Sequence, residues 1–152
     1  MVRVRSSGMT TYDISNYSVV ERLRNGQQVA IRAIRTDDTA LIADALRRVS
    51  TESLYQRTFS ARKIFSDKEL ARLVNIDFVR IVALVAVMQD PVRELMVGEG
   101  RYVRTGEAAG TSAEVAFLVD DEHKGIGIGS LLFRHLAVIA LDDAGKPAGD
   151  TA

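Results

Sequence analysis

The chain has 152 residues, of which 47% are apolar and 26% are charged, and these values are typical of one folded domain rather than a disordered chain. Its 20 basic side chains balance 20 acidic ones, so no overall positive field favours nucleic acid or an anionic membrane as a partner. Cysteine is absent, which excludes disulfides and thiolate nucleophiles, and two histidines are too few for most zinc sites, so we expect no metal.

Residues 1–17 are polar and lack periodicity, and we expect them to form a flexible leader outside the fold. Two alternating segments, 19–23 and 28–32, then flank Asn25-Gly26, a dipeptide typical of tight turns because both residues tolerate positive φ. They predict a β-hairpin at the start of a domain that spans residues 18–141. Four arginines alternate along this hairpin and are expected to form a solvated face: Arg22, Arg24, Arg32 and Arg35.

Three helical segments are predicted after the hairpin. The first begins where Thr36 offers a capping hydroxyl and the next two aspartates complement the helix dipole, and its apolar residues recur at helical spacing up to Val49. The second covers residues 52–59. The third opens at Ser66 with Glu69 three residues later, the pattern of a capping box. We expect these helices to form one layer.

Three strands and a helix complete the predicted order. Ile81 to Met88 is short and almost wholly apolar, as expected of a strand buried on both faces. This is the longest apolar run, far shorter than the roughly 20 residues of a spanning helix, and we expect a cytoplasmic protein without a membrane partner. Residues 95–103 and 113–119 read as two further strands, and a helix runs from about Gly129 to Leu141. The order predicts an α/β (α+β) fold.

The segment from His123 to Ser130 reads His-Lys-Gly-Ile-Gly-Ile-Gly-Ser and joins the last strand to the last helix. Its three glycines allow several backbone N–H groups to point into one concave turn. The start of the following helix favours an anion through its free N–H groups and its dipole, and Ser130 adds a hydroxyl. The loop therefore predicts a phosphate-binding site.

Two other phosphate-binding loops are excluded by spacing. A dinucleotide fingerprint needs a glycine three residues after its second glycine, where this chain has Ser130 or Leu132. A nucleoside-triphosphate loop needs Gly-Lys followed by Ser or Thr, but Lys124 precedes the glycines.

Residues 114–132, which carry Glu-Val-Ala-Phe-Leu-Val before the loop and Leu-Leu after it, resemble the central motif of the GCN5-related N-acetyltransferase (GNAT) superfamily. Lys124, Gly127 and Gly129 occupy the fixed positions of its loop pattern, with lysine where the family has glutamine or arginine. Residues 28–38, 50–55 and 77–87 resemble the branch of bacterial protein-lysine acetyltransferases. The resemblance implies a mixed central sheet with helices on both faces.

The resemblance also implies a function. It implies direct transfer of an acetyl group from acetyl-CoA to a primary amine, either a small molecule or a protein lysine, with a strand N–H near Leu118 or Val119 stabilising the oxyanion. The residues that would contact acetyl-CoA are Phe117, Leu118 and Val119 beside the pantetheine arm and Lys124, Gly125, Ile126, Gly127, Ile128, Gly129 and Ser130 around the pyrophosphate.

Glu114 is the candidate general base. A free lysine amine has a pKa of about 10.4, so forming the neutral nucleophile at pH 7 costs roughly 4 to 5 kcal/mol unless a base accepts the proton. Glu114 matches the place where some members of the family carry a catalytic glutamate. The other interpretation is an exposed carboxylate in an ordinary surface ion pair.

The neighbouring polar residues are given structural roles. The acidic run of residues 120–122 is expected to be a solvated turn with His123 exposed beside it, because carboxylates pointing inward would repel phosphates. His135 shares a helical stripe with apolar residues and is expected to be packed, so neither histidine is a candidate for catalysis. Tyr55 and Tyr102 are expected to be core rings with solvated hydroxyls.

The last helix and the residues after it set two further expectations. Residues 142–152 form a small, polar tail without a strand signal, whereas the family continues with a strand, a helix and a final hairpin, so we expect an incomplete domain. The helix is almost wholly apolar, and we expect a partner chain or a second copy to cover it. A truncated, catalytically silent GNAT-like domain that acts as an interaction module is therefore the alternative function.

Overall fold

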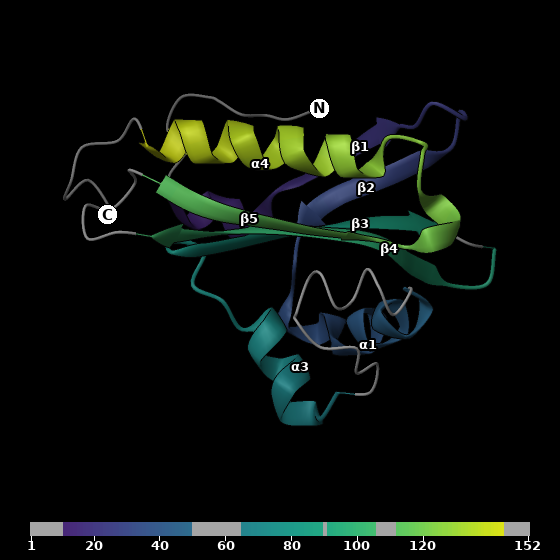
Figure 1. The fold of residues 1–152 in the computed structure, drawn as a ribbon, viewed down its shortest axis with the longest axis horizontal. Helices are drawn as coiled ribbons and strands as arrows, with labels where there is room; N and C mark the ends of the chain where they lie inside the picture. Colours follow the sequence, from purple (N-terminus) through teal and green to yellow (C-terminus); the bar gives the residue numbers. More distant parts are fainter. Residues whose placement is uncertain (1–10, 50–64, 90, 106–111, 145–152) are drawn as a thin grey trace.

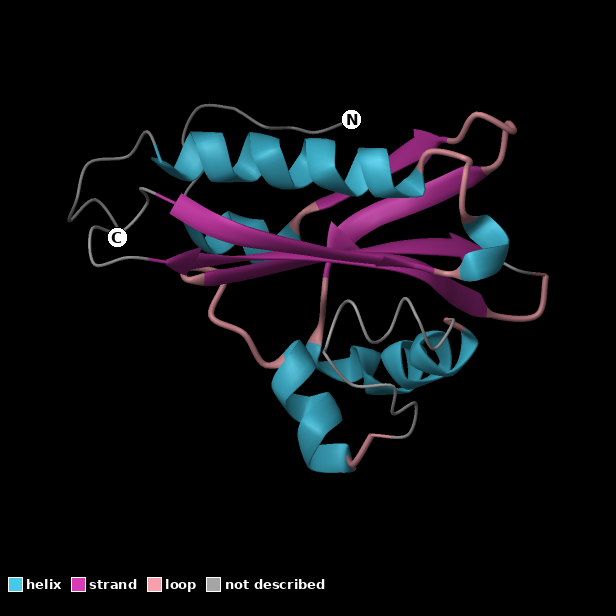
Figure 2. Cartoon of the chain, in the orientation of Figure 1, coloured by secondary structure: helices cyan, strands magenta, loops and turns pink. Residues whose placement is uncertain are grey.

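A computed structural model describes residues 11–49, 65–89, 91–105 and 112–144. Five strands form one sheet in the order β1-β2-β3-β4-β5, and helices cover both of its faces (Figures 1 and 2). The strands are β1 (Ser18–Arg22), β2 (Gln28–Ala33), β3 (Ile81–Gln89), β4 (Glu94–Thr105) and β5 (Ser112–Val119). The helices are α1 (Thr39–Arg48), α3 (Asp67–Val74) and α4 (Ile128–Ala144), with short 3-10 helices η1 (Thr11–Asn16), η2 (Thr36–Asp38) and η3 (Asp121–His123). The predicted α/β class is confirmed.

The strand pairing corrects one part of the prediction. All four pairings in the described sheet are antiparallel, whereas a mixed sheet was expected. A parallel pair needs a crossover connection, and within the described residues no strand follows α4. β3 is the central strand, and the side chains from Val82 to Ala86 are fully buried, as its continuous apolar run predicts.

One face of the sheet is covered by α4. Gly98 and Gly100 on β4 allow the helix and the ring of Phe117 to approach closely: a Cβ would lie 2.9 Å from Ile128 Cγ2 at Gly98 and 2.9 Å from the Phe117 ring at Gly100. α4 begins one residue before the predicted start and ends three residues after the predicted end. None of the described helices is long and apolar enough to cross a membrane.

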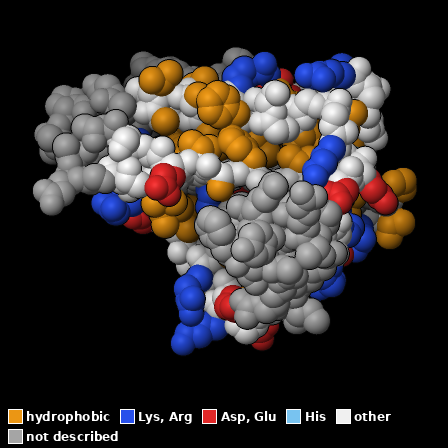
Figure 3. Space-filling model, in the orientation of Figure 1, with side chains coloured by type: hydrophobic (Ala, Val, Ile, Leu, Met, Phe, Trp, Pro, Cys, Tyr) orange, Lys and Arg blue, Asp and Glu red, His pale blue; other side chains and the backbone are white. Residues whose placement is uncertain are grey.

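The outer surface of α4 and β5 is apolar and exposed. Phe133 is 54% exposed and Leu141 is 74% exposed, and Val115 and Val138 are exposed as well. Hydrophobic side chains gather over these two elements in the space-filling view (Figure 3). Cover of this surface by a partner or a second copy stays a prediction.

The opposite face is covered by α1 and α3. Ile42 and Leu46 of α1 and Leu70 and Val74 of α3 form one buried cluster with Ala83 and Val85 of β3. The predicted capping box at the start of α3 is confirmed, since the Glu69 N–H donates to Ser66 Oγ at 3.1 Å and the Ser66 N–H donates to Glu69 Oε1 at 2.8 Å. The helix predicted over residues 52–59 and Tyr55 lie outside the described residues.

The end of the expected leader belongs to the fold. Ile14 and Tyr17 are buried, and η1 precedes β1 directly. The Tyr17 hydroxyl lies 2.5 Å from His135 Nδ1, and His135 Nε2 lies 2.6 Å from Glu21 Oε2. Burial and, to a smaller extent, the charge of Glu21 raise the pKa of Tyr17 to about 12. These bonds connect β1 and the residue before it to α4, so the structured domain begins before residue 18, and the packed role predicted for His135 is confirmed.

Arg32 was expected on the solvated face of the hairpin, and this prediction is wrong. Its guanidinium is buried and forms a two-pronged ion pair with Asp38, with Nη1–Oδ2 and Nη2–Oδ1 distances of 2.8 and 2.9 Å. The Arg35 N–H donates to the same carboxylate at 2.7 Å. A buried arginine needs such a partner, and Asp38 supplies it from the turn that leads into α1.

Candidate functional site

The glycine loop adopts the conformation that its sequence predicts. Gly125 and Gly127 have φ values of +85° and +101°, a region that residues with a Cβ rarely adopt. Buried Ile128 then anchors the first turn of α4 in the core, and the Leu131 N–H donates to the Gly127 carbonyl at 3.0 Å. The free N–H groups of this turn and the positive end of the helix dipole therefore face the space next to β5.

A cleft of about 560 Å³ lies between the loop, β5 and the turn of the β1-β2 hairpin. This volume is within the usual range for a small-molecule site. Nine of the ten residues predicted to contact a cofactor line it: Phe117, Leu118, Val119, Lys124, Gly125, Gly127, Ile128, Gly129 and Ser130. The tenth, Ile126, is half-buried and packs against the core instead. The structure thus brings the predicted residues together, and their role in binding stays a prediction.

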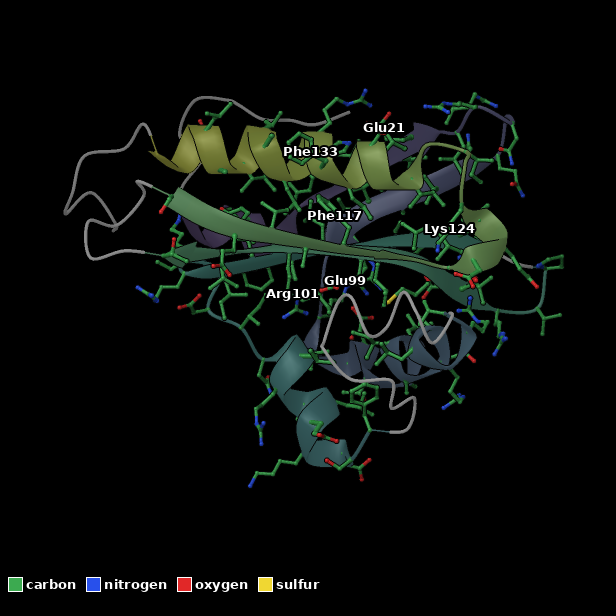
Figure 4. The ribbon with its side chains drawn as sticks, viewed as in Figure 1. Glu21, Glu99, Arg101, Phe117, Lys124 and Phe133 are labelled. Carbon is green, nitrogen blue, oxygen red and sulfur yellow. The ribbon has the colours of Figure 1, made fainter. Side chains whose placement is uncertain are left out.

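The β5 wall of the cleft is apolar. Phe117 points from β5 towards α4 (Figure 4), where its ring meets that of Phe133 edge to face with a centroid distance of 6.0 Å. Within the described sheet, β5 pairs only with β4, so alternate backbone N–H and C=O groups along its outer edge point away from the sheet. The cleft therefore combines an anion-binding end at the loop with an apolar, hydrogen-bonding wall along β5.

Glu114 lies near the start of β5 and does not line this cleft. Successive strand residues alternate between faces, so Glu114 and Leu118 point to the α1 side and Phe117 points to the α4 side. The Glu114 side chain is exposed, and within the described part of the chain it makes no hydrogen bond or ion pair. The alternative interpretation as a surface ion pair thus has no partner among those residues.

Residues 120–122 were expected to form a solvated acidic turn, and this prediction is wrong for Asp120. Asp120 is buried and forms an ion pair with Arg48 Nη1, and His123 Nδ1 lies 3.2 Å from the same carboxylate. Only the next two acidic residues are exposed. Arg48 comes from α1 on the other side of the sheet, and it neutralises a carboxylate that would otherwise repel an anion at the loop.

A second, smaller cavity lies on the opposite face, between α1, α3 and β4. Leu118 of β5 lines both cavities. Glu99 lines the second cavity and points to the α1 side of the sheet, where its Oε2 lies 2.5 Å from Arg101 Nε (Figure 4). The sequence analysis did not single out Glu99, because no motif marks this pair of residues on one strand, although Arg101 is only two positions away.

A strand that leads through a glycine-rich loop into a helix, with a cleft along that strand, is the local arrangement that the resemblance to acetyltransferases implies. The comparisons with known proteins agree. The chain is 30% identical to acetyltransferase PA5475 of Pseudomonas aeruginosa over 121 residues, which are 80% of this chain and 64% of that protein. It is 34% identical to acetyltransferase Pat of Mycolicibacterium smegmatis over 119 residues, which are 78% of this chain and 34% of that protein.

The crystal structure of the GNAT domain of S. lividans PAT matches the fold with a TM-score of 0.74 and 32% sequence identity, covering 84% of this chain and 73% of that one. No family model matches. The chain belongs to the GNAT superfamily and resembles its bacterial protein acetyltransferases, as its sequence predicts. It spans 64% and 34% of the lengths of the two curated relatives.

Proposed function

We propose that this protein is an N-acetyltransferase that moves an acetyl group from acetyl-CoA to a primary amine. The observation that supports this most strongly is the cleft, because it joins a phosphate-binding loop to an apolar strand edge, the two surfaces that a phosphorylated pantetheine thioester requires. The phosphates would bind at Gly125 to Ser130, with Lys124 beside them. The pantetheine arm would lie along Phe117, Leu118 and Val119.

The chemistry follows from this placement of acetyl-CoA in the cleft. Bound acetyl-CoA would supply an acetyl group activated as a thioester, and attack by an amine exchanges the C–S bond for a C–N bond and releases the thiol. A backbone N–H on the outer edge of β5, near Leu118 or Val119, would donate to the carbonyl oxygen as negative charge develops on it. Direct attack requires no covalent bond to the protein.

Glu114 would be the final acceptor of the amine proton. Strand residues rise about 3.3 Å each, so Glu114 lies about 13 to 16 Å along β5 from Leu118 and Val119, where the oxyanion donor is proposed. This separation is too long for direct transfer, so the proton would reach Glu114 through waters along the open edge of β5. A primary amine, of a small molecule or of a protein lysine, is the acceptor class.

Glu114→Gln is expected to lower turnover on the order of a hundredfold or more, because general-base catalysis contributes about 10²- to 10⁴-fold. Acetyl-CoA affinity should not change, since Glu114 lies outside the cleft. Thiol release measures the first quantity and calorimetric titration the second. Glu94→Gln, also an exposed carboxylate near a strand start, is the control and should retain full turnover. Equal turnover of Glu114→Gln and the unmodified chain would refute the role of Glu114.

The same two measurements on the unmodified chain distinguish the proposed enzyme from the catalytically silent domain. Acetyl-CoA is titrated first, and thiol release is then followed with an amine panel that includes a lysine peptide. Binding with turnover supports the proposal, and the preferred amine identifies the acceptor. Binding without turnover favours the interaction module, and no binding would contradict the assignment of the loop.

A further inference from the structure

The turn of the β1-β2 hairpin holds one side chain in a defined place. The Gly26 N–H donates to the Leu23 carbonyl at 2.9 Å, and the Leu23 N–H donates to the Gln27 carbonyl at 2.7 Å. Leu23 is buried in the core, and Arg22 Nη1 donates to the Gly26 carbonyl at 3.0 Å. Arg24 lies within this turn, so the hydrogen bonds of the neighbouring residues fix its backbone.

Arg24 extends from the turn to the glycine loop, about 100 residues later in the chain, and lines the cleft there. Its Nε lies 3.6 Å, and its Cζ 4.0 Å, from the position that a Cβ would take on Gly127. The guanidinium therefore lies beside the backbone of the turn whose N–H groups face the cleft. The side chain is exposed and makes no hydrogen bond or ion pair with the described residues.

The charges around the loop show why a cation is needed at this place. The turn that enters the loop carries three carboxylates, Asp120, Asp121 and Glu122, against one lysine. Asp120 is paired with Arg48, and Lys124 Nζ lies 3.0 Å from Asp121 Oδ1. The loop's own lysine is thus already engaged by a carboxylate. A dianionic ligand would meet a nearly neutral or acidic loop without a cation from another element.

We propose that Arg24 is a phosphate-binding residue of this cleft and that its guanidinium closes the site over the phosphates of the CoA nucleotide. The inference rests on the proposed use of acetyl-CoA. Arginine suits the role because its planar donors bind two phosphate oxygens at once, whereas lysine acts as a single charged point. Through Arg24, the turn between β1 and β2 then contributes to the cofactor site beside the loop.

The test compares Arg24→Gln and Arg24→Lys with the unmodified 152-residue chain. Binding of acetyl-CoA, acetyl-3′-dephospho-CoA and S-acetylpantetheine is measured by calorimetry. Arg24→Gln should weaken acetyl-CoA binding on the order of tenfold, the size expected for one charge-assisted contact at an exposed site, and Arg24→Lys by less. A loss shared by acetyl-CoA and its dephospho form assigns Arg24 to the pyrophosphate. A loss limited to acetyl-CoA assigns it to the 3′-phosphate.

Arg72→Gln is the matched control. Arg72 is an exposed arginine near the end of α3, on the other face of the sheet, and its loss should leave all three affinities unchanged. Two results would overturn the inference about Arg24 and leave the proposed function standing. One is an unchanged acetyl-CoA affinity in Arg24→Gln, and the other is an equal loss of affinity for S-acetylpantetheine, which has no nucleotide phosphates. Failure of the unmodified chain to bind acetyl-CoA would overturn the proposed function and the inference with it.

Discussion

Gly127→Val is expected to reduce acetyl-CoA affinity by at least about tenfold, through a change in the backbone rather than the loss of a side chain. Gly127 has a φ of +101°, where a residue with a Cβ is strained by about 1–2 kcal/mol and a β-branched one by more. The loop would relieve this strain by turning its N–H groups away from the cleft. The added methyl groups would also extend towards Arg24, whose Nε lies 3.6 Å from the Cβ position.

Calorimetric titration of acetyl-CoA measures the effect, and thermal unfolding shows that the variant remains folded. Gly129→Ala is the comparison within the same loop. Gly129 does not have a positive φ, and its Cβ would meet only Val119 Cγ2, at an ordinary 3.9 Å. The melting temperature of Gly129→Ala should stay near that of the unmodified chain, and its loss of acetyl-CoA affinity should be smaller than that of Gly127→Val. Full affinity in Gly127→Val would mean that the loop does not bind the phosphates.

The parts of the fold that could be predicted from the sequence are those with local causes. Asn25-Gly26 defines its own turn, and Gly26 has the positive φ that the turn requires. Ser66 and Glu69 cap a helix three residues apart, and the continuous apolar run of β3 indicates a strand buried on both faces. The glycine loop belongs to this group, because its conformation depends on residues next to one another.

The parts that could not be predicted have partners far away in the chain. Tyr17 and His135 are 118 positions apart, and Arg48 and Asp120 are 72 apart, so no local pattern shows that either pair will form. The same cause explains Arg24, which was expected only to lie on the solvated face of the hairpin and which lines the cleft through contacts about 100 residues away. The predicted leader extends too far for this reason, since Ile14 and Tyr17 are buried and Tyr17 bonds to His135 of α4.

The difference between local and long-range causes affects the parts of the candidate site unequally. The phosphate end depends mainly on the loop, so its residues could be chosen from the motif. The face on which Glu114 lies follows from the alternation along β5, but its distance from the reacting amine depends on how the acceptor enters. The cations that balance the acidic turn come from α1 and the hairpin, and only the structure shows that Arg48 and Arg24 lie there.

Asp38→Asn is expected to lower the free energy of unfolding by about 3 kcal/mol at pH 7, because it leaves the buried guanidinium of Arg32 without a counter-charge. The Asp38 and Arg32 side chains are only 3% and 6% exposed, so water cannot replace the lost partner. Urea unfolding measures the effect. Asp37→Asn removes an exposed carboxylate from the preceding position and should change stability by less than about 0.5 kcal/mol.

The pH dependence identifies the ion pair as the cause. Burial alone would raise the pKa of Asp38, but the hydrogen bonds from Arg32 and the Arg35 N–H, together with the two arginine charges, hold that pKa below its ordinary value of 3.8. The stabilisation is therefore fully present above about pH 5, where the carboxylate is ionised in both the folded and the unfolded chain. Below that pH the unfolded chain takes up a proton first, so the stabilisation decreases and is lost as the pH falls through the lower pKa of the folded state. The difference between Asp38→Asn and the unmodified chain should shrink between pH 5 and about pH 3, and a difference that stays constant over this range would show that lost packing, not lost charge, destabilises the variant.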